Sequence, residues 1–226
     1  MAKGSSKVEI VAVSRKGTKE KADVVIQEEV VVVRTGGEVH KFHCLPANLE
    51  EMILGNLKSR GMDVSFSAIR KIAPGEFEVA LLPSAKSPGK CLSHKKITPE
   101  EVFAAVGLLD ENSPLFQKTG GAHVIGICGD KKVFVEDTSR HCAIDKAIGR
   151  AIREGIDLSR SFLVVSCRQT ATTIKKAIWV RIPIVISLSA PTSLAVKEAR
   201  QHEITLIGFA TQEKFNVYSH PWRVKT

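Results

Sequence analysis

Four short polar segments stand where predicted strands end and predicted helices begin, and they are the first candidates for chemistry. In chain order they are Thr119-Gly120-Gly121-Ala122-His123, Glu136-Asp137-Thr138-Ser139-Arg140-His141, Ser166-Cys167-Arg168 and Ser189-Ala190-Pro191-Thr192-Ser193. Backbone N–H groups at a helix start attract anions, and glycine lets the backbone approach a phosphate closely. Arg140 and Arg168 can each donate two hydrogen bonds to phosphate oxygens. Together the segments predict a site for a dianion.

Each segment taken alone also has a structural interpretation. Serine, threonine and aspartate before a helix are ordinary caps, and paired glycines make ordinary turns. However, the segments recur at equivalent places, at the strand ends where ligands of α/β sheets usually bind, and two of them carry an arginine. That is more than capping requires, so we favour the binding interpretation.

Cys91 is a second candidate, because it lies in a stretch, residues 83–96, that is rich in proline, serine, glycine and lysine. This composition predicts an exposed loop. Its cationic neighbours are Lys90, Lys95, Lys96 and a protonated His94. They are expected to lower the pKa of the thiol and to favour thiolate near neutral pH. The alternative is an incidental thiol in a flexible basic loop.

The other cysteines are expected to be free thiols that pack as small apolar residues, since the total of five is odd and the N-terminus lacks the apolar core of a signal peptide. They are Cys44, Cys128, Cys142 and Cys167. Cys142 and Cys167 fall inside predicted ligand-binding turns, so they could instead hold sulfur or change nucleotide specificity. No metal site is predicted from His40, His43 and Cys44, because neighbours on a strand alternate between faces.

The composition places these candidates in an ordinary folded protein. The 226 residues are 43% hydrophobic and 25% charged, with a formal net charge of +9 that favours an anionic partner. Prolines interrupt the longest uncharged apolar stretch, residues 182–196, so no membrane span is predicted and a cytoplasmic location is expected. A basic nucleic-acid binder is the alternative class. It ranks last because no helix-turn-helix, zinc-finger or aromatic ribonucleoprotein motif is present.

The first part of the chain is predicted to be rich in β-strands. The expected strands are 8–13, 24–34, 38–45, 64–72 and 76–82. Gly36-Gly37 predicts a hairpin turn, and the spacing of Leu49, Ile53 and Leu57 predicts a short helix that ends at Gly61. After the 83–96 loop, Thr98, Pro99 and Glu101 predict a capping box and a helix to about Leu109.

From Ala122 onward, predicted strands alternate with predicted helices. The expected strands lie near 122–128, 133–136, 162–166, 184–188 and 205–209, and the helices span 141–154, 170–180 and 192–201. This alternation predicts an α/β sandwich with a partly parallel sheet. We therefore expect an N-terminal β-rich subdomain over residues 1–97, ending in the Cys91 loop, and a C-terminal α/β domain over residues 98–226.

Four longer segments carry a specific resemblance: TGGAHVIGI, EDTSRHCAIDKAIG, SAPTSLAVKEA and ITLIGFATQEKFNVYSHPWR. In order and spacing they resemble the blocks of the formate dehydrogenase accessory sulfurtransferase (FdhD-like) family. Weaker similarity covers Glu28-Glu29 and the stretch 45–61. The resemblance implies a C-terminal fold like that of cytidine deaminases, but not their chemistry, because the His-x-Glu and Pro-Cys-x-x-Cys motifs of zinc deaminases are absent.

The resemblance also implies a function and partners. The family handles a bis-guanine dinucleotide molybdopterin cofactor, for which GDP would be an analogue, and passes sulfur to it from a cysteine desulfurase. The client would be apo formate dehydrogenase or a related molybdenum or tungsten enzyme, and a homodimer is expected. The family's Cys-x-x-Cys reads Cys91-Leu92-Ser93-His94 here, and Cys142 and Cys167 replace an asparagine and a glycine of the family blocks.

Two functions follow, which differ only at Cys91: a sulfur carrier, or a cofactor chaperone that has lost sulfur transfer together with the second loop cysteine. Cys91 is the candidate catalytic residue. The candidate cofactor-binding residues are Gly120, Gly121, His123, Asp137, Arg140, His141, Asp145, Lys146, Ser166, Arg168, Ser189, Ala190, Pro191, Thr192, Ser193, Phe209, Asn216 and Tyr218.

Overall fold

The computed structural model describes residues 4–81 and 89–225. Over these ranges the strands form a two-stranded hairpin, a four-stranded sheet and a six-stranded sheet. The expected α/β class, with a β-rich N-terminal part, is confirmed. No helix in the described ranges is long and apolar enough to cross a membrane.

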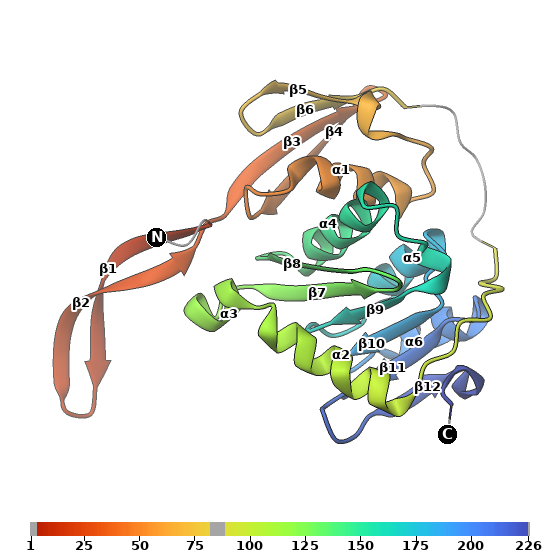
Figure 1. Ribbon diagram of the computed structural model, residues 1–226. Helices are drawn as coiled ribbons and strands as arrows, with labels where there is room; N and C mark the ends of the chain where they lie inside the picture. The colour runs from red at the N-terminus through yellow and green to blue at the C-terminus, as the bar shows by residue number, and fades with distance from the viewer. Residues whose placement is uncertain (1–3, 82–88, 226) are drawn as a thin grey trace.

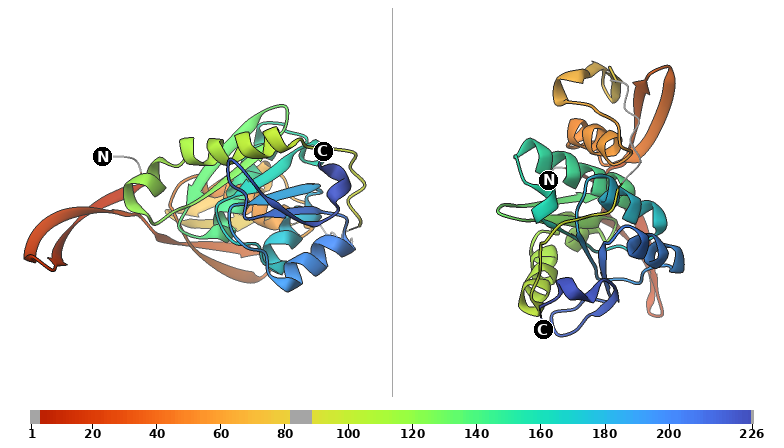
Figure 2. Two further views of the ribbon diagram at one scale, coloured as in Figure 1. Left: turned by 90° about the horizontal axis from the view of Figure 1, so that it is seen from below. Right: turned by 90° about the vertical axis from the view of Figure 1, so that its right-hand side faces the viewer.

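The hairpin consists of β1 (Ser5–Ser14) and β2 (Gly17–Ile26), and it projects from the rest of the molecule as an arm (Figures 1 and 2). A single strand over 24–34 was expected, and that prediction was wrong. The chain leaves β2 at Ile26 and starts a new strand in another sheet at Glu29. The outer part of the arm was not recognised as a strand, because residues 18–23 are mostly polar. Both faces of the hairpin are exposed to solvent there, so no apolar alternation marks the strand.

The four-stranded sheet has the order β4-β3-β6-β5. Its strands are β3 (Glu29–Thr35), β4 (Glu38–Cys44), β5 (Ile69–Ala73) and β6 (Glu76–Val79). The predicted turn at Gly36-Gly37 is present, and both glycines have positive φ, as a tight hairpin turn requires. Helix α1 (Leu49–Lys58) covers one face, where Val31 and Val33 pack against Met52 and Leu54. β5 is shorter than expected, because a 3₁₀ turn occupies Phe66–Ala68.

The six-stranded sheet has the order β12-β11-β10-β9-β7-β8. Its strands are β7 (His123–Cys128), β8 (Lys132–Asp137), β9 (Phe162–Val165), β10 (Ile184–Ser187), β11 (Thr205–Gly208) and β12 (Asn216–Ser219). β9, β10 and β11 run parallel, whereas β7, β8 and β12 are joined antiparallel. The expected partly parallel sheet is therefore confirmed, and β12 is an addition at its edge.

Helices cover both faces of this sheet (Figure 1). On one face pack α4 (Arg140–Arg153), α5 (Ala171–Trp179) and α6 (Ser193–Gln201), and on the other packs α2 (Pro99–Glu111). Along β9 the residues alternate accordingly: Leu163 and Val165 face the first group, whereas Phe162 and Val164 face α2. The capping box at the start of α2 is present as predicted, while the short α3 (Pro114–Thr119) was not expected.

Candidate functional site

The strand register brings the four polar segments to one edge of the six-stranded sheet. At the start of β7, His123 pairs with Asp137, the last residue of β8. The last residues of β9 and β10, Val165 and Ser187, are paired with each other, and β11 ends beside them. Gly208 at the end of β11 pairs with Asn216 at the start of β12. We call this row of connections the ligand edge.

Three helices begin at the ligand edge, because α4, α5 and α6 follow β8, β9 and β10 directly. Ser139 Oγ accepts a hydrogen bond from the Cys142 N–H at 3.4 Å, and Thr192 Oγ1 accepts one from the Ala195 N–H at 3.3 Å. The structural interpretation therefore holds for these two hydroxyls. The remaining first-turn N–H groups of the three helices point out of the same edge, where they favour an anion.

Arg140 and Arg168 are the free cationic groups of the ligand edge. Arg140 is half-buried and Arg168 is exposed. Within residues 4–81 and 89–225, neither guanidinium forms a hydrogen bond or an ion pair. Burial raises the pKa of the Cys167 thiol to about 11, against the opposing charges of both arginines, so both guanidinium groups act on the same thiol. Burial and the charge of Arg140 lower the pKa of His123, which favours the neutral imidazole.

Several other candidate residues hold the edge together. Ser166 Oγ accepts from the Val124 N–H at 3.0 Å, which joins β9 to β7. The Phe209 N–H donates to the Ser189 carbonyl at 3.2 Å, and a side chain at Gly208 would collide with Pro191 and Tyr218. The exposed candidates at the edge are Gly120, Gly121, Arg168, Thr192, Ser193, Phe209 and Asn216.

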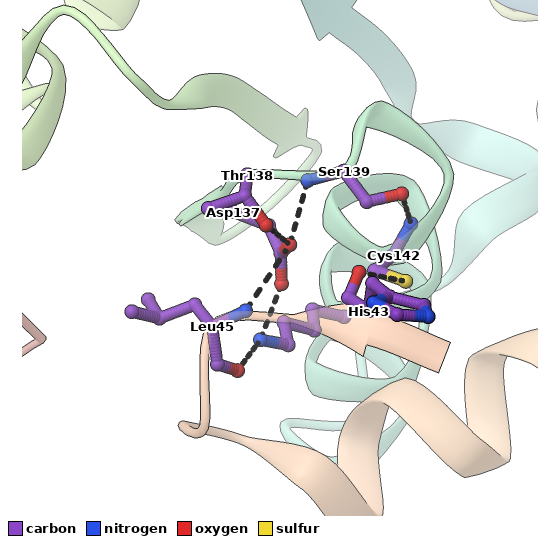
Figure 3. Close-up of polar contacts among 7 residues, drawn as sticks. His43, Leu45, Asp137, Thr138, Ser139 and Cys142 are labelled. Atoms are coloured by element: carbon purple, nitrogen blue, oxygen red, sulfur yellow. Dashed lines mark hydrogen bonds and ion pairs between the residues drawn. The ribbon is translucent and has the colours of Figure 1, made fainter. Parts of the chain in front are cut away.

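Asp137, Asp145 and Lys146 have a different place from the one expected for ligand contacts. All three are fully buried. Figure 3 shows Asp137 beside Leu45 of the N-terminal part and Ser139 at the start of α4. Lys146 Nζ forms an ion pair with Asp137 Oδ2 at 2.5 Å and donates to the Leu45 carbonyl at 2.7 Å. Asp137 Oδ1 accepts from the Ser139 N–H at 2.8 Å, so this pair fixes the start of α4.

Asp145 is bound just as fully by protein groups. It pairs with Lys176 at 2.5 Å and accepts hydrogen bonds from Ser59 Oγ at 3.1 Å and from Asn56 Nδ2 at 2.9 Å. Asp145 is fully buried and all of these partners are protein groups, so its role is to hold α4 in place and not to contact a ligand. The same holds for Asp137 and Lys146, and these three side chains offer no group to a ligand.

Cys91 is buried, with 3% of the residue exposed, which contradicts the expected exposed loop position. Its N–H donates to the His202 carbonyl at 3.0 Å, and its thiol donates to the Arg181 carbonyl at 3.5 Å. Burial raises the pKa of the Cys91 thiol, so the expected lowering by lysines was also wrong. Lys90 instead pairs with Glu203 at 3.0 Å, and Arg181 and Arg223 are the cations that act on the thiol.

A pocket of about 540 Å³ lies beside Cys91, lined by Lys90, Leu92, Ser159 and Arg181 among others. Arg181 follows the end of α5, and His202 follows the end of α6. α5 and α6 begin at the ligand edge and end near Cys91. Cys91 therefore lies on the opposite side of the sheet from the ligand edge.

The remaining cysteines are buried free thiols, as expected. Cys44 and Cys142 contact each other between β4 and α4: a hydrogen bond from Cys44 lowers the pKa of Cys142, and the same contact with burial raises the pKa of Cys44. Among the residues with described placement, no three His, Cys, Asp or Glu side chains are grouped to hold a metal ion.

Comparison with known proteins identifies the family. The model of the FdhD/NarQ family matches residues 75–225. "Sulfur carrier protein FdhD" of Bacillus pumilus is 30% identical over 90% of this chain and 91% of its own length. The protein of the same name from Sulfurisphaera tokodaii is 33% identical over 89% of this chain and 92% of its own. The chain belongs to the FdhD/NarQ family.

The fold of this FdhD/NarQ member also has a solved counterpart. A putative formate dehydrogenase accessory protein from Desulfotalea psychrophila has a TM-score of 0.85 against this chain. The likeness covers 98% of this chain and 100% of that one at 24% sequence identity, which establishes a shared fold. The likeness therefore extends over nearly the whole length of both chains.

Two residues of this FdhD/NarQ chain stand out only in the structure. Gln169 is fully buried at the ligand edge, where its N–H donates to the Ala190 carbonyl at 3.1 Å. Its Oε1 has no hydrogen-bond partner among the described residues. Arg223 is fully buried beside Cys91. Gln169 follows one segment that the sequence singled out and Arg223 ends another, but only burial distinguishes them from ordinary polar neighbours.

Proposed function

We propose that this FdhD/NarQ protein binds a bis-guanine dinucleotide molybdopterin cofactor at the ligand edge and supports its sulfuration. The observation that carries the proposal is the pair of guanidinium groups of Arg140 and Arg168, which have no partner in residues 4–81 and 89–225 and lie beside the starts of three helices. A guanine dinucleotide supplies a diphosphate. Two arginines and several helix-start N–H groups are the donors that bind a diphosphate strongly.

The chemistry of the edge also fits the rest of a guanine nucleotide. Phe209 is 48% exposed and has a positive φ of 51°, which is uncommon for a bulky residue. An exposed aromatic ring offers a stacking surface to a guanine or a pterin. Gln169 Oε1 is a buried acceptor without a donor among the described residues, and guanine carries N–H donors. The bound cofactor would bring the molybdenum or tungsten centre that receives the sulfur.

Cys91 is the proposed sulfur carrier. Its thiolate would attack the outer sulfur of a persulfide on a cysteine desulfurase, giving a Cys91 persulfide and releasing the desulfurase thiolate. This exchange needs no further oxidant, because the transferred sulfur is already at the sulfane level. Since Cys91 is 3% exposed, its loop must open before a desulfurase can reach it. The client that receives the cofactor would be apo formate dehydrogenase or a related molybdenum or tungsten enzyme.

A cofactor chaperone without sulfur transfer is the second candidate, and the burial of Cys91 favours it. Mass spectrometry of the intact protein after incubation with desulfurase and cysteine separates the two. For a sulfur carrier we expect added mass of sulfur that reductant removes, that Cys91→Ser abolishes and that Cys128→Ser retains. No added sulfur in any variant would leave the chaperone. The pterin nucleotide that co-purifies with the protein tests the binding claim itself.

We also propose that the protein acts as a homodimer. The arm supports this, because a two-stranded hairpin is only marginally stable in water by itself. Val11 and Val13, on one face of the arm, are 58% and 77% exposed. Sedimentation analysis tests the proposal, and a monomer at all concentrations would overturn it.

A further inference from the structure

Arg223 is a fully buried arginine near the C-terminal end of the chain. Nη2 of its guanidinium donates to the carbonyls of Cys91 and Ser93 at 3.0 and 3.3 Å, and Nε donates to the Ser93 carbonyl at 3.4 Å. Nη1 donates to the Glu203 carbonyl at 2.7 Å. All three nitrogen atoms are thus bound, and two of them hold the main-chain carbonyls of Cys91 and Ser93.

These carbonyls take the place that a carboxylate usually has beside a buried arginine. Across residues 4–81 and 89–225, no carboxylate forms an ion pair with Arg223. The Glu203 side chain pairs instead with Lys90 at 3.0 Å. Burial of an unpaired cation is unfavourable, and it lowers the pKa of Arg223. The carbonyl dipoles of the Cys91 loop are therefore a main source of stabilisation for this charge, and the charge in turn stabilises the loop.

The same C-terminal segment binds the loop further along. The Ile97 N–H donates to the Arg223 carbonyl at 2.8 Å, and the Lys225 N–H donates to the Ile97 carbonyl at 2.8 Å. Ser93 Oγ donates to the Ser159 carbonyl at 2.6 Å. Residues 91–97 are therefore held at several points. On Cys91 itself, the Arg223 side chain binds the carbonyl, while the His202 and Arg181 carbonyls bind the N–H and the thiol.

We propose that Arg223 is the positioning residue of the sulfur-carrying loop: it holds the carbonyls of Cys91 and Ser93 and thereby keeps the thiol closed in its pocket. The inference rests on the sulfur-carrying role proposed for Cys91. It assigns the guanidinium a task beyond folding, since loss of its hydrogen bonds would release the thiol to solvent. Arg223 contacts the loop main chain and does not act on the sulfur directly.

The test is the rate at which iodoacetamide alkylates each cysteine of the folded full-length protein, followed by peptide mapping. Arg223→Gln should raise the Cys91 rate by roughly tenfold or more, since charge-assisted hydrogen bonds are lost. Cys128, which is 2% exposed in the core, should react as slowly as before. Arg200→Gln is the matched control, because Arg200 also donates to a carbonyl, that of Tyr218, at 3.2 Å.

The pH profile of alkylation separates positioning from a merely structural role. Burial is the largest cause that raises the pKa of Cys91, so release of the loop should move the profile of Arg223→Gln to lower pH, although a cation is lost. An unchanged Cys91 rate and profile, or equal acceleration of Cys91 and Cys128, would overturn the proposal. If Arg223→Gln does not fold, Arg223→Lys provides the same comparison, with a smaller acceleration expected.

This assay uses no sulfur donor, so it is independent of the sulfur-loading experiment. Failure of wild-type Cys91 to accept sulfur would count against the proposed function. It would not affect the conclusion that Arg223 keeps the loop closed, which alkylation measures separately. Normal loading of Cys91 with no effect of Arg223→Gln on alkylation would reject the role of Arg223 alone.

Discussion

Charged residues near the ligand edge divide into two kinds that the sequence does not distinguish. Arg140 and Arg168 have no partner within the described residues, whereas Lys146 and Asp145 are fully buried with ion-pair partners. All four stood in or next to predicted ligand segments. Their difference comes from contacts with Leu45, Asn56 and Ser59, about a hundred residues away in the chain, which no local pattern reveals. The prediction that Cys91 is exposed failed for the same reason: it rested on local loop composition, whereas contacts with Arg181 and His202, far away in the chain, bury the residue.

Removal of the Lys146 charge should destabilise the protein strongly. Lys146→Met leaves Asp137 buried without its counter-charge, so we expect the free energy of unfolding to fall by about 3 to 5 kcal/mol. Urea denaturation followed by circular dichroism measures this change. The double variant with Asp137→Asn should recover part of the loss. A Lys146→Met protein as stable as the wild type would mean that the pair is not a structural support.

His141 should make the protein less stable in mild acid. Burial, together with the charges of Lys176 and Arg140, lowers its pKa below the ordinary value, against the opposing effect of Asp145. The unfolded chain therefore takes up a proton near pH 6.5, whereas the folded protein takes it up only at lower pH, so stability should fall as the pH drops below about 6.5. Melting temperatures between pH 8 and 5.5 should decline less in His141→Asn. An identical decline in both proteins would refute this assignment.

At the scale of elements, local patterns predicted well wherever one face of a helix or strand is buried. The helix after Thr98, the turn at Gly36-Gly37 and the alternation from β7 to β11 follow from capping, glycine conformation and apolar periodicity. The arm, α3 and β12 were missed or misjudged, because short or solvent-exposed elements carry little apolar pattern. The meeting of the connections after β8, β9 and β10 was predictable, since strands that run in one direction share their carboxyl ends. The first polar segment reaches the same edge because β7 starts there, antiparallel to β8 and β9.

The crossing of α1 and α4 could not be predicted, because it depends on two glycines inside helices. A Cβ atom at Gly149 would lie 1.9 Å from the Glu51 carbonyl oxygen, and one at Gly55 would lie 1.9 Å from that of Asp145. The two helix backbones therefore touch. This contact joins the N-terminal sheet to the domain that carries the ligand edge.

Gly149→Ala should consequently destabilise the protein by about 3 kcal/mol or more, since the methyl group would overlap main-chain atoms that cannot rotate away. Gly107→Ala in α2 is the matched control. Its nearest neighbour is the flexible Gln212 side chain at 3.3 Å, so the better helix propensity of alanine should leave stability unchanged or raise it by up to about 1 kcal/mol. Thermal denaturation of both variants checks the prediction, and equal stability of the two would contradict the close crossing.

At the scale of the whole molecule, the two proposed sites lie at opposite ends of one sheet. The starts of α4, α5 and α6 form the ligand edge, while Cys91 lies against the residues that follow the ends of α5 and α6. Each site therefore has its own set of side chains. The two sites share only the sheet and the helices that lie between them.

This separation predicts that the two sites can be disabled independently. Cys91→Ser should abolish sulfur loading but change the affinity for GDP by less than about 0.5 kcal/mol, because distant sites without shared partners contribute additively. Arg140→Ala should leave alkylation of Cys91 unchanged. Calorimetry and peptide mapping measure the two effects. A large loss of GDP affinity in a folded Cys91→Ser protein would show that the sites are coupled.

The central claim is that the ligand edge binds guanine nucleotide phosphates, and titration calorimetry of the purified protein with GDP tests it most directly. We predict binding that weakens by roughly 1.5 to 3 kcal/mol in Arg140→Ala and in Arg168→Ala, as expected for a lost charge-assisted hydrogen bond, with melting temperatures preserved. Arg160→Ala, an exposed arginine before β9 at the opposite end, should bind GDP as the wild type does. The absence of GDP binding by well-folded protein, or arginine variants that lose stability but keep their affinity, would contradict the account.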